Sequence, residues 1–256
     1  MDIIDSALDP IKAVVWGERA FASLGAPVVC DYENYMLIVD DADLEAATQR
    51  LRSAGFRDCS WSYGSREPEF YQGKIKENIY RAITKEYSNL DKYATKFFLP
   101  LPDESSEKVV LLPSSYAHIH ASDDMLTRDG NLLWPDGPLL LKSLVQTAVR
   151  EPIEGKWKSD LEMWAISYVY GELMVDDDVM DSCQDEAAKN WFNDNIRRFN
   201  GGIDRVTFTK RVGRLGYDES LAGREFSEPR NKVEQEDNKE VQEGNKEDDG
   251  QDGQQE

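Results

Sequence analysis

The chain has 256 residues, 40% of them apolar, which is enough to bury a core in one sizeable domain or in two small ones. Its formal charge of −20 argues against a general affinity for nucleic acid, because binding to the phosphate backbone needs clustered Lys and Arg. No stretch approaches the roughly 18 apolar residues of a membrane span, and no basic segment precedes an apolar run at the N-terminus. We therefore expect a cytoplasmic protein without membrane contact.

The cysteines support the same compartment. Cys30, Cys59 and Cys183 are far apart, odd in number and form no CxxC pair. This pattern indicates neither a disulfide framework nor a zinc site, and it fits a reducing environment.

The first third of the chain predicts alternating strands and helices. Ala13–Trp16 is short, apolar and β-branched, which indicates a strand or the start of a buried helix, and Gly17 follows it. Residues 18–24 carry apolar side chains at helical spacing, and Gly25 is suited to end that helix. Tyr35–Val39 is apolar at every position, so we expect a strand that is covered on both faces.

A second helix and strand follow. Residues 40–43 offer carboxylates for a helix N-terminus, and the next ten residues place Leu44, Ala47 and Leu51 on one face. Gly55 ends this helix, and residues 56–63 predict a further strand.

The rest of the ordered region becomes helical. Residues 64–73 predict a loop, Lys74–Glu86 a helix, and residues 94–101 and 108–112 two strands; helices are then predicted at 139–149, 156–174 and 181–199. We expect an α/β (α+β) domain over residues 1–220, with an α/β part at about 10–115 and a helical part at about 136–200.

The C-terminal segment has a different composition. Residues 224–256 contain twelve Asp and Glu against five Lys and Arg, and very few apolar residues. Such a segment cannot bury enough apolar surface to offset its chain entropy, so we predict a disordered acidic tail. The alternative is that the tail makes the protein a scaffold by recruiting a basic partner.

Several short pieces together carry a family resemblance. They are Trp16-Gly17-Glu18, Leu24-Gly25-Ala26-Pro27, Leu37-Ile38-Val39-Asp40, Ala54-Gly55-Phe56, Leu111-Leu112-Pro113-Ser114-Ser115 and Leu133-Trp134-Pro135. In this order they resemble the nucleotidyltransferase superfamily and, more narrowly, fungal nucleotidyltransferase-like proteins that are distantly akin to the toxins of AbiE-type systems. The resemblance spans roughly residues 10 to 200 and implies a small mixed sheet with flanking helices.

The resemblance implies a phosphate site at the end of the first strand. Active members of the superfamily carry a pair of small residues there, because only a minimal side chain lets backbone amides approach phosphates. Here the pair is Trp16-Gly17, so Gly17 is the candidate nucleotide-binding residue and the indole is a departure from the pattern.

The resemblance also implies a magnesium site on the second strand, where two carboxylates two residues apart share one face. Asp31 and Glu33 have this spacing but lie two or three residues earlier than the pattern expects. The expected positions hold Asn34 and Met36, and a thioether is a poor ligand for a hard cation. Glu107, ahead of the strand at 108–112, is the candidate for the third carboxylate.

These departures lead to two hypotheses about the site. In the first, the protein is a catalytically degenerate nucleotidyltransferase fold that acts by binding a nucleotide or a protein. In the second, it is an active Mg²⁺-dependent enzyme that moves a nucleoside monophosphate to an acceptor, with Asp31 and Glu33 as catalytic and metal-binding residues and Gly17 near the phosphates.

Two other groups of residues have simpler interpretations. His118 and His120 have the spacing of two imidazoles on one strand face, but no third ligand of matched geometry accompanies them, so we expect a polar loop. Ser114 and Ser115 lack the Gly-x-Ser-x-Gly elbow of a nucleophilic serine.

Overall fold

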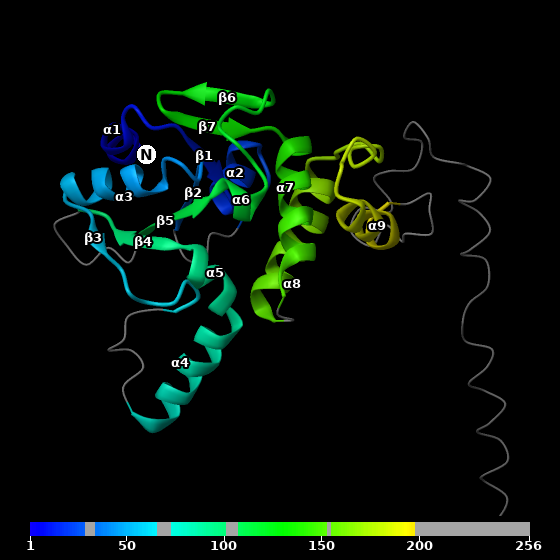
Figure 1. The fold of residues 1–256 in the computed structure, drawn as a ribbon. Helices are drawn as coiled ribbons and strands as arrows, with labels where there is room; N and C mark the ends of the chain where they lie inside the picture. Colours follow the sequence, from blue (N-terminus) through cyan, green and yellow to red (C-terminus); the bar gives the residue numbers. More distant parts are fainter. Residues whose placement is uncertain (29–33, 66–72, 101–106, 153–154, 198–256) are drawn as a thin grey trace, which may run out of the picture. The chain divides into compact units, whose positions relative to one another are not determined.

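A mixed sheet with helices beside it forms the structure (Figure 1), a computed structural model that describes residues 1–28, 34–65, 73–100, 107–152 and 155–197. Within these residues seven strands form one sheet in the order β3-β4-β5-β2-β1-β7-β6. The strands are β1 (Ala13–Trp16), β2 (Tyr35–Val39), β3 (Arg57–Asp58), β4 (Thr95–Phe98), β5 (Lys108–Pro113), β6 (Leu126–Asp129) and β7 (Leu132–Pro135). The expected mixed α/β class is confirmed.

Some helices are interspersed with the strands along the chain, and the others follow the last strand. They are α1 (Asp2–Leu8), α2 (Glu18–Ser23), α3 (Leu44–Ser53), α4 (Lys74–Glu86), α5 (Ser88–Tyr93), α6 (Ser114–Ala117), α7 (Gly137–Arg150), α8 (Lys156–Met163), the π-helix η2 (Trp164–Glu172) and α9 (Glu186–Asn195). The described residues belong to one compact unit, Met1–Thr207, and share one hydrophobic core.

The three central strands are buried at every position. β1 runs antiparallel to β2, with Trp16 opposite Met36, and β2 runs parallel to β5, with Tyr35 opposite Val109. Continuous apolar runs suit strands that are covered on both faces, because neither face needs polar side chains.

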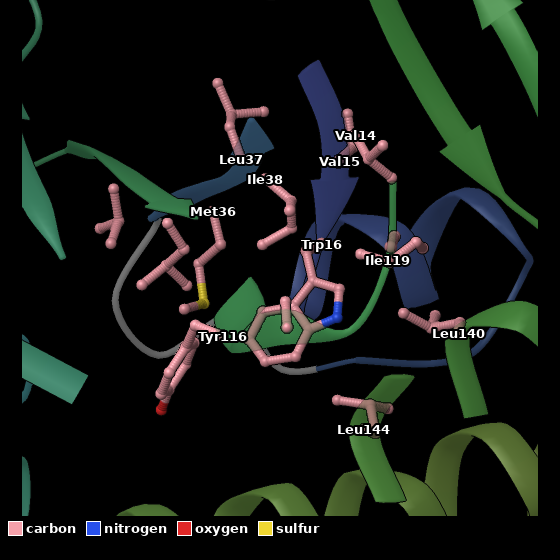
Figure 2. Packing of buried hydrophobic residues seen from close by; sticks show 14 of the residues in the cluster. Val14, Val15, Trp16, Met36, Leu37, Ile38, Tyr116, Ile119, Leu140 and Leu144 are labelled. Carbon is pink, nitrogen blue, oxygen red and sulfur yellow. The ribbon is translucent and has the colours of Figure 1, made fainter. Parts of the chain in front are cut away.

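Helix α7 covers the end of β1. The Asp136 carboxylate accepts a hydrogen bond from the backbone N–H of Leu139 at 2.8 Å and so caps the helix, whose first turn also contains a proline. Leu140 and Leu144 of α7 are fully buried, and Figure 2 shows them with Trp16, whose side chain points from β1 toward α7. Burial of each such leucine contributes about 1.5–3 kcal/mol.

A buried polar network joins α5, α6 and α8 to the C-terminal end of α7. The Trp157 indole N–H donates to the Tyr116 hydroxyl at 2.7 Å, and that hydroxyl donates to Oε1 of Glu151 at 2.5 Å. The Asn89 side-chain amide donates to the same Glu151 oxygen at 3.0 Å. Buried polar groups that are paired in this way specify one arrangement of the elements around them.

Three predicted elements differ in the structure, and α1, α5, α6, β6 and β7 lie where no element was predicted. The strand expected at 56–63 is only β3, because the backbone N–H of Tyr63 bonds to the Asp91 carboxylate at 2.9 Å instead of to a strand. The single helix expected at 156–174 changes from α-helix to π-helix at Trp164. The helix expected at 181–199 begins at Glu186, because the Asp185 carboxylate caps it; residues 198–199 lie outside the described residues.

The predicted acidic tail, residues 224–256, also lies outside the described residues. Within the part of the chain that the structure describes, no helix is both long enough and apolar enough to cross a membrane.

Candidate functional site

Three strand ends meet at one edge of the sheet. Because β1 is antiparallel to β2 and β2 is parallel to β5, the end of β1 lies at the same edge as the starts of β2 and β5. Gly17 directly follows β1, while Asn34 and Glu107 directly precede β2 and β5. The topology thus brings two of the expected site residues, Gly17 and Glu107, to one edge.

Gly17 is held in a conformation and a space that favour glycine. Its φ of 67° lies in the left-handed region, and a Cβ built on it would lie 3.0 Å from Sδ of Met36 and 3.7 Å from the Trp164 ring. Gly17 is buried, and its carbonyl accepts hydrogen bonds from Ala20 and Phe21 at the start of α2. The space beside this glycine is therefore filled by a thioether and an indole.

Aromatic side chains surround this end of β1. Trp164 packs edge-on against Phe21 and Trp157, with ring centroids 5.4 Å apart in both pairs, and lies 6.5 Å from Trp16. The Tyr63 hydroxyl donates to Sδ of Met36 at 3.5 Å. Trp157 and Trp164 are buried, so their rings form part of the core.

Two polar side chains at this edge have buried atoms that lack hydrogen-bond partners among the described residues. The Asn34 side chain leaves both its amide nitrogen and its amide oxygen unpaired, although the residue is only 4% exposed. Nε of Arg19 is also unpaired, and its guanidinium lies 4.4 Å from the centroid of the Tyr35 ring. An unpaired buried amide costs about 1–3 kcal/mol, so the state of Asn34 needs a physical explanation.

The carboxylates expected to bind magnesium, Asp31 and Glu33, lie outside the described residues. Glu107 is half-buried at the start of β5. Within the described ranges, no group of three or more His, Cys, Asp or Glu residues is arranged to hold a metal ion. The side chains that the structure places around Gly17, a thioether and an indole, do not suit Mg²⁺, which prefers oxygen ligands.

A buried lysine lies near the same edge, and sequence reasoning assigned it no role. Lys108 begins β5, is 3% exposed, and donates from Nζ to the Ser65 carbonyl at 2.9 Å. Its ammonium lies 5.4 Å from the Trp61 ring centroid, and burial lowers the pKa of Lys108. Sequence reasoning also missed the buried state of Asn34; the available signal was a polar residue at the start of an apolar strand.

The histidines and serines lie after the end of β5, at the opposite edge of the sheet from Gly17. Nδ1 of His120 is 3.4 Å from the Asp40 carboxylate, whereas His118 adopts a left-handed backbone conformation and burial lowers its pKa. The Ser114 hydroxyl donates to the Asp41 carboxylate at 2.9 Å. These contacts tie α6 to the segment after β2.

Comparison with known proteins yields no relative: no family model, no curated protein and no solved structure matches this chain.

Proposed function

We propose that the chain is a nucleotidyltransferase-fold protein that has lost nucleotidyl transfer and acts by binding. One observation carries this proposal: Met36 and Trp164 fill the space beside Gly17, where an active member would admit phosphates. Nucleotidyl transfer needs hard oxygen ligands for Mg²⁺ close to the triphosphate, and the thioether of Met36 is not such a ligand.

Trp16 supports the same proposal. The pattern expects a small residue at this position, but the indole is fully buried and its N–H bonds to Ser143 at 2.9 Å. A side chain committed to the core in this way cannot leave it to admit a ligand without breaking that bond.

Asn34 and Arg19 provide the binding capacity in this proposal. The Asn34 amide offers one donor group and one acceptor side by side, the arrangement that pairs with the edge of a nucleobase. The Arg19 Nε–H has no partner among the residues that the structure describes, and its cationic charge favours an anionic ligand. The first candidate ligand is therefore a nucleotide, bound without catalysis.

We place this activity in the cytoplasm as part of the same proposal. Cys59 and Cys183 are free and buried in the described part of the chain, and free thiols are compatible with a reducing compartment.

Calorimetric titration with a non-hydrolysable nucleoside triphosphate, with and without Mg²⁺, tests the proposal. We expect binding that does not need Mg²⁺, survives the Asp31→Asn, Glu33→Gln double substitution, and is lost in Asn34→Leu. Metal-dependent binding that the double substitution abolishes would overturn it in favour of an active enzyme. No binding under any condition would exclude nucleotides and leave a protein as the ligand.

A further inference from the structure

Helix α4 is poorly covered by the other residues that the structure describes. It has 13 residues, and none of its described side chains is buried. Ile79 is 48% exposed and Ala82 is exposed, while Ile83 is half-buried against the core. A helix of this length is only marginally stable by itself in water, and the described residues leave part of its apolar face open to a partner.

The sequence of α4 is amphipathic. Ile79, Ala82 and Ile83 are spaced by three and one, which places them on one face of the helix. Arg81 and Lys85 are four residues apart, so they are neighbours on the helix surface.

The charge of α4 is opposite to that of the whole chain. The helix holds four Lys and Arg residues against two Glu residues, in a protein with a formal charge of −20. One of these two carboxylates is engaged within the protein, because Glu86 accepts a hydrogen bond from the backbone N–H of Lys156 at 2.6 Å. This local reversal of sign selects for an acidic partner.

The C-terminal end of α4 is fixed, which orients the exposed face. Glu86 bonds to the start of α8, and the next residue, Tyr87, is 4% exposed and donates from its hydroxyl to Asp160 at 3.0 Å. Helix α5 follows directly (Figure 1). A partner would therefore meet a helix that is anchored at one end and not a free peptide, which lowers the entropy cost of binding.

We propose that α4 is a docking helix for a protein partner that has an apolar groove edged with carboxylates. Ile79 and Ala82 enter the groove, and Arg81 and Lys85 pair with the carboxylates at its rim. An anionic membrane or nucleic acid fits less well, because each presents an extended negative surface that repels the rest of a −20 protein. A groove makes contact only with the helix, and charges beyond about 8 Å are screened at physiological salt.

The test uses the full chain and a defined probe. The probe is a fluorescent helical-hairpin peptide whose two helices form a groove of Leu side chains with Glu along both rims, and fluorescence anisotropy measures its binding. We expect binding that weakens with added salt and falls at least about tenfold in Ile79→Ser and in Arg81→Glu, Lys85→Glu. These side chains are exposed, so the variants should keep the melting temperature of the parent protein.

Lys12→Glu, Arg50→Glu is the matched control, because it also reverses two exposed cationic residues, both outside α4, and it should leave binding unchanged. Equal loss of binding in this variant would attribute the effect to net charge and overturn the proposal, as would peptide binding that the α4 variants do not change. Two further measurements use the same variants. Binding to phosphatidylserine vesicles through α4 would reassign the helix to membranes, and α4-dependent self-association in sedimentation would reassign it to a second copy of the chain.

Discussion

The indole N–H of Trp16 donates a hydrogen bond to the Ser143 hydroxyl at 2.9 Å, and that hydroxyl donates to the backbone carbonyl of Ala117. The relationship joins the last residue of β1 to the middle of α7 and the end of α6. It explains how the sheet accommodates a large polar-edged side chain next to Gly17, because the only polar atom of the indole side chain is paired inside the core.

Replacement of Ser143 tests this bond. Ser143→Ala removes the acceptor of the buried Trp16 N–H and the donor to Ala117, so we expect the free energy of unfolding to fall by about 1–3 kcal/mol. Urea denaturation measures it. Ser182→Ala, at an exposed serine, is the control and should change stability by less than about 0.5 kcal/mol. An equal, small effect in both variants would show that the Trp16 bond contributes nothing.

Alanine substitutions at Gly17 and Gly25 distinguish the stability cost of backbone strain from the cost of steric crowding. Gly17 and Gly25 both have positive φ, 67° and 87°, but a Cβ on Gly25 would meet no atom within 4 Å, whereas one on Gly17 would lie 3.0 Å from Met36. Gly25→Ala should therefore lose about 1 kcal/mol of stability through strain alone, and Gly17→Ala should lose at least about 1 kcal/mol more. Denaturation of both variants measures the difference. Equal losses would mean that Met36 does not pack on Gly17.

Asn34 provides a prediction in which stability and binding change in opposite directions. Asn34→Leu replaces a buried amide that has no partner among the described residues by an apolar group of similar size, so the free protein should gain about 1 kcal/mol of stability. The same substitution should abolish nucleotide binding. Thermal melting and titration of one preparation measure both. A loss of stability in Asn34→Leu would show that the amide is paired in solution.

Asp41 predicts a pH dependence of stability. Hydrogen bonds from Ser115 and Ser114 hold the pKa of the Asp41 carboxyl below its ordinary value of 3.8. A folded-state pKa below the unfolded one gives a stabilisation that is complete above pH 3.8 and is lost as the pH falls through the folded-state pKa.

The advantage of the parent over Asp41→Asn should therefore shrink when denaturation is measured at pH values decreasing from about 6 to about 3. Asp43→Asn is the matched control, because the Asp43 side chain makes no capping hydrogen bond to α3. An advantage that stays constant over this range would contradict the assignment.

Substitution of Tyr116 measures how much the buried hydrogen-bond network contributes to the free energy of unfolding. Tyr116→Phe removes both the donor to Glu151 and the acceptor of the Trp157 N–H, so we expect a loss of about 2–4 kcal/mol. Burial and the neighbouring Glu151 carboxylate raise the pKa of Tyr116 far above its ordinary value. The alkaline absorbance titration of the folded protein should therefore be the same with and without Tyr116; a missing phenolate transition in the variant would contradict this.

Local patterns predicted the elements whose apolar residues follow a clear period. The strands Ala13–Trp16 and Tyr35–Val39 and the helix Lys74–Glu86 have the predicted bounds. Periodicity succeeded there because it reflects which face of an element is buried. It failed at 56–63, where Asp91, distant in sequence, binds the Tyr63 backbone in place of a neighbouring strand.

The sequence by itself determined the mixed α/β class, the placement of Trp16 before Gly17 and of Met36 within an apolar strand, and the spacing of apolar and cationic residues in α4. These properties reside in residue types and in spacings of a few residues. Only the tertiary structure decided that Met36 and Trp164, which are 128 residues apart in the sequence, both pack beside Gly17. It also decided that Asn34 is buried without a partner among the described residues. Strand order and burial depend on contacts between distant segments, and the free energy of such contacts is not encoded in any local pattern.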